Sequence, residues 1–436
     1  MERNLVKQLV RWKENPGKKP LIIKGVRQCG KTFLLKGFGA AHYGDMVYCN
    51  FESNDALHAI FNGDLDAHRI ISELGVMRQK PIDPEKTLVI FDEIQFCNRA
   101  LTSLKYFCEN APEYHVVCAG SLLGLALSKP LSFPVGKIDF LTLYPLSFSE
   151  FLSANNEALL WEYLENLPAD KKISEAFTGK LERYLKTYYI TGGMPEAVAS
   201  WLEFQNIEKV ETIQQKILDS YELDFAKHAP ANEFPKLSEI WHSIPGQLAK
   251  ENTKFIFSQV KKGRRAKDLE DALEWLLGAG LAYKVAKVEK PFMPLSAYAD
   301  STFFKLYMAD VGLLRKMSRL PASVILENTA AYKEFKGALT ENFVLSELVT
   351  LYNTAPFYWK SGNTAEVDFI IQNEADIVPI EVKSARNDKA KSLGEYRKKY
   401  APPLAVKTSL KNIAPAGEVQ NIPLYMLWQL KKYLAK

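Results

Sequence analysis

Hydrophobic and polar positions change their spacing along the chain, and each spacing predicts a different kind of element. In the first third, short apolar runs alternate with helix-length amphipathic stretches. This alternation predicts a parallel β-sheet covered by helices on both faces, which is an α/β fold. The first run ends at residue 24, and the later ones cover 46–51, 87–91, 115–119 and 138–143.

Residues 150–235 are rich in Leu, Glu, Lys and aromatic side chains at helical spacing, and they predict a helical segment. Within it, Gly192-Gly193 and Pro195 predict a break between two helices. From Leu237 the pattern changes to shorter helices. One of these places a set of apolar side chains on a single face, namely Leu269, Ala272, Leu273, Leu276 and Leu277.

Gly278 and Gly280 are expected to end that helix, and Leu281, Tyr283 and Val285 then alternate as a strand does. A helix, a glycine stop and an amphipathic strand are together typical of a winged helix-turn-helix.

Composition narrows the classes of protein that fit. A chain of 436 residues suggests two to four domains, and 47% hydrophobic with 25% charged residues is typical of a soluble globular protein. A net charge of +5 permits nucleic-acid binding without requiring it. The five cysteines lack CxxC spacing, which favours free thiols over disulfides or a zinc site. With no apolar run near the ~20 residues that cross a bilayer, and no signal-peptide core, we expect a cytoplasmic protein.

The sharpest motif is GVRQCGKT, which follows the first predicted strand, precedes a predicted helix and matches GxxxxGK[ST]. The match predicts a P-loop that binds a nucleoside triphosphate with Mg²⁺. Lys31 would reach the terminal phosphates, and the Thr32 hydroxyl would ligate the metal. The alternative, a chance match in a turn, is disfavoured by the flanking elements. The expected nucleotide-binding residues are Gly25, Val26, Arg27, Gln28, Cys29, Gly30, Lys31, Thr32 and Phe33.

The strand in TLVIFDEIQ ends in Asp92-Glu93, which is the Walker B arrangement. Asp92 would hold Mg²⁺ through water, while Glu93 would polarise the attacking water as a general base. The alternative is an acidic strand end that caps a helix. Because Glu93 is present, we expect hydrolysis and not binding alone.

These segments, together with FPVGKIDFLTLYPLSFSEFL and YYITGGMPEAV, resemble the bacterial and archaeal AAA-family ATPases that carry a DUF4143 C-terminal region. The resemblance extends over essentially the whole chain and implies an ATPase with ATP and Mg²⁺ as cofactors. Ser121 lies at the sensor position of such ATPases and, with Lys31 and Glu93, is a candidate catalytic residue. It could equally cap the next helix.

One departure from the family pattern is Gly136-Lys137, where such proteins often carry Gly-Arg. A lysine cannot reproduce the planar fork of an arginine at a phosphate, so a nucleotide-sensing role there is in doubt. Arg27 and Arg99 are candidates for an arginine finger on position alone.

A basic stretch precedes the expected recognition helix of the winged helix and could neutralise DNA phosphates; it contains Lys261, Lys262, Arg264, Arg265 and Lys267. The helix itself carries acidic residues that would repel a phosphate backbone, namely Asp268, Glu270, Asp271 and Glu274. Two interpretations therefore stay open, a DNA-binding element or a module that packs against protein.

Near the C-terminus, FYWKSGNTAEVDFIIQNEADIVPIEVKSA predicts two strands joined by a polar hairpin. Asp368, Glu381 and Lys383 match the PD-(D/E)xK nuclease pattern, and Glu341 on a preceding helix matches its helical acid. The carboxylates would hold Mg²⁺, and Lys383 would orient the attacking water. The alternative is that these residues are surface charges on the hairpin.

The sequence thus predicts a P-loop NTPase sheet with a helical lid, a winged helix-turn-helix and a C-terminal restriction-endonuclease-like α/β domain. The expected boundaries are 1–150, 151–235, 236–322 and 323–436.

Three functions stay open. The chain could be an ATPase that positions a DNA-directed nuclease domain, a nucleotide switch with an inactive nuclease-like scaffold, or a signalling or defence ATPase with a protein partner. DNA and a second copy of the chain are candidate partners, and a membrane is not.

Overall fold

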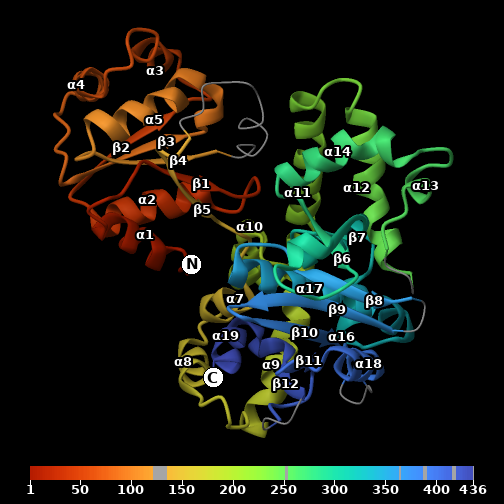
Figure 1. The fold of residues 1–436 in the computed structure, drawn as a ribbon. Helices are drawn as coiled ribbons and strands as arrows, with labels where there is room; N and C mark the ends of the chain where they lie inside the picture. The colour runs from red at the N-terminus through yellow and green to blue at the C-terminus, as the bar shows by residue number, and fades with distance from the viewer. Residues whose placement is uncertain (121–134, 251–253, 363–364, 386–389, 415–418, 436) are drawn as a thin grey trace. The chain divides into compact units, whose positions relative to one another are not determined.

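The computed structural model describes residues 1–120, 135–250, 254–362, 365–385, 390–414 and 419–435. They form two compact units, coloured along the chain in Figure 1. The first unit holds residues 2–144 with 278–280, and the second holds 145–277 and 281–436.

The first unit is built on a parallel sheet of five strands in the order β2-β3-β4-β1-β5. Its strands lie within one or two residues of the predicted runs, so the expected parallel sheet is confirmed. They are β1 Leu21–Lys24, β2 Asp45–Asn50, β3 Thr87–Asp92, β4 His115–Ala119 and β5 Asp139–Thr142.

Helices pack on both faces of this sheet because successive strand residues point to opposite sides. On one face, Gly39 of α2 approaches Met46 and Leu88. On the other, Val89 and Phe91 share a buried core with α3, α4 and α5. The helices of the unit are α1 Val6–Glu14, α2 Lys31–His42, α3 Asp55–Ile60, α4 Ala67–Met77 and α5 Asn98–Asn110.

The middle of the chain is helical, as predicted, and the break at Gly192-Gly193 separates α9 from α10. These helices belong to the second unit and contact its C-terminal part: the Phe148 amide donates to Glu347 (2.8 Å) and the Gln429 side chain donates to the Leu164 carbonyl (2.9 Å). The sequence analysis attached this segment to the ATPase core instead, and its role as a lid stays a prediction. The helices are α7 Phe148–Ala154, α8 Ala158–Asn166, α9 Glu175–Thr191, α10 Pro195–Phe204 and α11 Ile207–His228.

Next come α12 Phe234–Leu248, α13 Phe257–Val260 and α14 Ala266–Gly278, followed by the antiparallel pair β6 Ala282–Val288 and β7 Ala299–Met308. The apolar face predicted for α14 is buried apart from the half-buried Leu277, and the helix ends at Gly278 as expected. Three helices followed by a hairpin is the order of a winged helix, an assignment that stays a prediction.

The hairpin β6–β7 is not a separate wing, because β6 also pairs in parallel with β8. The result is one sheet of seven strands in the order β12-β11-β10-β9-β8-β6-β7. Its other strands are β8 Phe357–Ser361, β9 Ala365–Asn373, β10 Asp376–Val382, β11 Ala405–Ser409 and β12 Val419–Pro423. The remaining helices are α15 Val311–Met317, α16 Ala322–Leu326, α17 Ala330–Tyr352, α18 Lys391–Tyr400 and α19 Leu430–Leu434.

Helix α18 packs on one face of this sheet, where Leu393 and Tyr396 share a core with Trp359 and Val367. Helix α17 brings polar side chains to Tyr307 and Lys305 of β7. Because side chains alternate along a strand, these two helices serve opposite faces of the sheet.

All five cysteines are free thiols, in agreement with the sequence analysis. Within the described residues, no helix has both the length and the apolar character that crossing a bilayer requires.

Candidate nucleotide site and carboxylate cluster

The loop between β1 and α2 requires its glycines. Gly25 has φ +151°, and a Cβ atom there would lie 2.2 Å from the Leu143 carbonyl oxygen. Gly30, just before α2, has φ +93°, a conformation that side chains rarely adopt. Both glycines of the GxxxxGK[ST] pattern are therefore needed for the loop to take this shape.

Lys31 is the first residue of α2 and is buried within the loop. Its ammonium group donates to the carbonyl oxygens of Gly25 (2.9 Å) and Val26 (2.8 Å). The fully buried thiol of Cys29 lies 4.0 Å from it. The loop thus holds the lysine charge at its centre, next to a helix N-terminus that favours anions.

Thr32 and Asp92 meet although they come from different elements. The Thr32 hydroxyl donates to Oδ2 of Asp92 at 2.7 Å, and the Tyr48 hydroxyl donates to the same oxygen, also at 2.7 Å. The backbone amide of Glu93 donates to the other oxygen, Oδ1. Burial first, and then the bond to Asp92, raise the pKa of Tyr48 to about 12, which keeps its hydroxyl protonated as a donor.

A hydroxyl and a carboxylate in contact are the hard oxygen donors that Mg²⁺ prefers. Thr32 and Asp92 therefore fit the metal that accompanies a nucleotide, with Tyr48 fixing the orientation of the carboxylate.

Glu93 follows directly and adopts a left-handed backbone conformation, with φ 51°. Its carboxylate Oε2 accepts a hydrogen bond from the Gln95 side-chain amide at 2.5 Å. Strain of this kind at a non-glycine residue is common where a side chain must be presented at a functional site.

Sequence analysis missed Tyr48 and Gln95. The contact of Tyr48 depends on the pairing of β2 with β3, which no local motif reveals.

The other nucleotide-site predictions have mixed outcomes. Ser121 lies outside the described residues. Phe33 is 71% exposed on α2. Lys137, the residue that departs from the family pattern, forms an ion pair with Glu109 at 3.0 Å.

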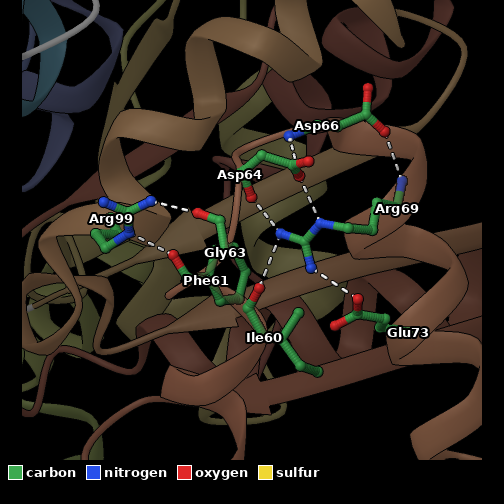
Figure 2. A network of polar contacts seen from close by, with 8 residues as sticks. All are labelled: Ile60, Phe61, Gly63, Asp64, Asp66, Arg69, Glu73 and Arg99. Carbon is green, nitrogen blue, oxygen red and sulfur yellow. Dashed lines mark hydrogen bonds and ion pairs between the residues drawn. The ribbon is translucent and has the colours of Figure 1, made fainter.

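Arg99 has a structural partner set, which Figure 2 shows. Its guanidinium donates to the carbonyl oxygens of Phe61 and Gly63, in the turn between α3 and α4. Arg69 holds the same turn through Asp64 and the Ile60 carbonyl. Within this chain the Arg99 guanidinium therefore stabilises a turn, and its role as an arginine finger stays a prediction.

In the second unit, the residues of the nuclease pattern come from three elements. Glu341 lies on α17, Asp368 on β9 and Glu381 on β10, and β9 and β10 form the predicted antiparallel hairpin. Lys383 follows β10, and its ammonium lies 2.8 Å from Glu381 Oε1, so these two side chains share a face. The Val382 amide donates to Asp368 Oδ2 at 2.7 Å.

The carboxyl groups affect one another. Burial, together with the nearby Glu341 and Glu381, holds the pKa of Asp368 well above its ordinary value. Burial also raises the pKa of Glu381, against the effect of Lys383. Carboxyl groups with raised pKa values are common at functional sites, although buried ion-pair networks produce them too.

Further charged residues complete this cluster, and sequence analysis missed them. Lys305 of β7 is 1% exposed, and its ammonium lies 2.6 Å from Glu366 and 3.7 Å from Glu341. Tyr307 donates to Glu341 at 2.8 Å, and Lys360 pairs with Glu366 at 3.0 Å. The alternation of β7 could have placed Lys305 and Tyr307 on one face, but nothing local indicates which face the carboxylates occupy.

We define the carboxylate cluster as Glu341, Glu366, Asp368 and Glu381 with Lys305, Tyr307, Lys360 and Lys383. Across the parts of the chain that the structure describes, no three or more His, Cys, Asp or Glu side chains are arranged to hold a metal ion. The nuclease role of these residues accordingly stays a prediction.

Comparison with known proteins matches three segments of the chain to three different families. Residues 17–152 match the family described as AAA domain. The chain carries an AAA-type P-loop domain. Residues 336–427 match a domain of unknown function, DUF4143, and residues 182–324 match another, DUF8612. The predicted combination of an AAA domain with a DUF4143 region is therefore confirmed, and the winged helix and the nuclease likeness are not.

One curated relative, an uncharacterized protein of Haemophilus influenzae, is 26% identical over 235 residues, which cover 52% of this chain and 50% of that protein. The chain thus matches about half the length of this relative.

Among solved structures, the Walker-type ATPase of Pyrococcus abyssi aligns with a TM-score of 0.46 at 14% identity, covering 72% of this chain and 94% of that one. AMPPCP-bound DnaA from Aquifex aeolicus aligns with a TM-score of 0.27 at 16% identity, covering 63% and 86%. The domain assignment rests on the family matches.

Proposed function

We propose that this AAA domain binds ATP with Mg²⁺ and hydrolyses it, and that its nucleotide state controls the second unit. The observation that carries the proposal is the contact of Thr32 with Asp92 beside the buried Lys31. Lys31 would turn from the loop carbonyls to the terminal phosphates. Thr32 and Asp92 would hold the metal, which supplies charge compensation to the phosphates when bound.

Glu93 is the proposed general base, because it directly follows Asp92, to which its backbone amide donates, and because its carboxylate accepts a hydrogen bond from Gln95. A base in this place would orient the attacking water and take its proton. The bond from Gln95 limits the directions in which the carboxylate can point.

We predict that Lys31→Ala abolishes ATP binding, because the loop holds this buried ammonium at its centre. Glu93→Gln should retain binding and slow hydrolysis by about 10²–10⁴-fold, since a base contributes that much. Nucleotide binding by calorimetry and phosphate release by the full chain measure the two effects. Lys7→Ala, an exposed lysine of α1 in the same unit, is the control. Unchanged ATP affinity in Lys31→Ala would refute the assignment.

For the second unit we propose a DNA-directed role. The supporting observation is the basic stretch of residues 261–267, which leads into α14. Lys262, Arg265 and Lys267 are exposed in it, and Lys261 and Arg264 pair with Glu239. The exposed Glu270, Asp271 and Glu274 of α14 count against contact through that helix and favour the rival function, an ATPase that acts on a protein partner.

Whether the second unit cuts DNA or only contacts it is a further choice. Because the described residues include no group arranged to hold a metal, the inactive nuclease-like scaffold is favoured over a nuclease.

We therefore predict that the full chain with Mg²⁺, with or without ATP, retards plasmid and linear DNA and leaves both intact. Lys262→Gln/Lys267→Gln should weaken DNA binding several-fold, because each lysine neutralises about one phosphate. Gel shift and cleavage assays on the same samples measure both properties. Cleavage that Asp368→Ala removes while ATP hydrolysis persists would establish the nuclease, and absence of any shift would favour the protein partner.

A further inference from the structure

Three carboxylates of the carboxylate cluster are already paired with lysines. The carboxylates of Glu341, Glu366 and Glu381 face the ammonium groups of Lys305, Lys360 and Lys383. Buried charges persist when they are paired in this way.

Lys305 differs from the other two lysines of the cluster. Lys360 and Lys383 are half-buried, whereas the Lys305 side chain is 2% exposed and comes from β7, on the far side of β8 and β6 from the carboxylate strands. It bridges two acidic residues of different elements, Glu366 on β9 and Glu341 on α17. A divalent cation shared by carboxylates would make the same kind of bridge.

Only some of the carboxylate oxygens in the cluster accept hydrogen bonds or ion pairs. Glu341 Oε2 accepts the Tyr307 hydroxyl, and Asp368 Oδ2 accepts the Val382 amide. Glu381 Oε2 is buried without a hydrogen-bond partner, but Oε1 of the same carboxylate is paired with Lys383. A single unpartnered oxygen does not make a metal site, and the neighbours that would complete one are bound to Lys305, Tyr307 and backbone.

We propose that the Lys305 ammonium, which bridges Glu341 and Glu366, is the resident cation of the carboxylate cluster and takes the place of the divalent metal that a catalytic site of this residue pattern would bind. The proposal rests on the scaffold form of the proposed function and deepens it. The ion pairs of the cluster then hold β7 against β9 and α17, and the cluster binds no Mg²⁺ in the folded protein.

The first test compares Mn²⁺ binding by the nucleotide-free full chain and by Asp368→Asn, with electron paramagnetic resonance of free Mn²⁺ as the readout. Both proteins keep the same P-loop, so any difference belongs to the carboxylate cluster. We expect equal numbers of bound Mn²⁺ ions. Loss of a bound ion in Asp368→Asn would overturn the proposal, and this comparison does not depend on any variant of Lys305.

The second test removes the ammonium with Lys305→Met and uses Lys360→Met, which loses a half-buried partner of the same Glu366, as the control. Taking one partner from a buried pair should lower Tm by about 10 °C, against about 3 °C or less for the control. Millimolar Mn²⁺ should restore part of the loss in Lys305→Met alone. Equal stability of the two variants, or a loss that Mn²⁺ does not relieve, would overturn the proposal.

ATP hydrolysis by the same samples reports on the P-loop unit separately. An inactive wild-type chain would count against the proposed function and leave the Mn²⁺ comparison unaffected.

Discussion

Several ionisable side chains of the second unit are buried, and Glu347 is the clearest case. Its buried carboxylate accepts the backbone amide of Phe148 at 2.8 Å. Burial raises its pKa to about 7 from an ordinary value of 4.5, although the amide bond opposes the shift. The folded state therefore holds a proton there that the unfolded state releases.

This shift fixes the sign of a pH effect. Between about pH 4.5 and 7 the folded chain binds more protons at Glu347, so the free energy of unfolding falls as pH rises, by about 3 kcal/mol in total. Glu347→Gln keeps an oxygen for the Phe148 amide and removes the charge. We predict that it flattens this slope and makes the unit more stable than wild type at pH 8, as urea unfolding across pH 5–8 would show. Glu334→Gln, exposed on the same helix, should leave the slope unchanged.

Among single residues, the sequence predicted those that belong to a local motif. It missed those that reach the site from distant strands. Lys31 and Thr32 follow from spacing within one loop. Tyr48 and Lys305 reach Asp92 and Glu366 from other strands, so their roles depend on strand order and on which face each residue takes.

Among the elements, the turn between α9 and α10 is tightly packed against its neighbours. The Gly193 amide donates to Asp310 Oδ2 at 2.6 Å, and the Gly193 carbonyl accepts the Leu146 amide at 2.7 Å. A Cβ atom on Gly193 would lie 2.2 Å from the Leu146 carbonyl oxygen. The turn thus joins the start of α7 and the cap of α15 in one contact.

We predict that Gly193→Ala lowers the free energy of unfolding by about 3 kcal/mol or more, because backbone atoms cannot move aside as side chains do. Gly179→Ala is the matched control, since that position in α9 has open space around it and alanine favours a helix. It should raise stability by about 0.5–1 kcal/mol. Thermal unfolding of the two variants tests the pair, and similar Tm values would contradict this account of the turn.

The elements themselves were predicted well where their pattern is local. The strands of the first sheet, the break at Gly192-Gly193 and the end of α14 at Gly278 all occur where expected. Pairing between distant strands was not predicted, and β6 with β8 is the example, because parallel pairing across a long connection leaves no mark in either strand.

In the whole molecule, the structure forms two compact units, and the four expected domain boundaries stay a prediction. The helical segment of residues 145–235 contacts the C-terminal part of the chain, for example where the Asn412 side chain, after β11, bonds to the Ile173 backbone before α9. The sequence predicted a helical lid for the nucleotide-binding sheet, since amphipathic helices show that they need a partner but not which one. The sheet of the P-loop unit, in contrast, takes all its strands from one continuous segment, residues 21–142.

The seven-stranded sheet runs across two family matches, with β6 and β7 in residues 182–324 and β8 to β12 in residues 336–427. A protein that contained only one of these segments would expose an unpaired strand edge, which could pair with other chains. Recombination between relatives should therefore exchange the two segments together, so that they evolve as a single inherited piece.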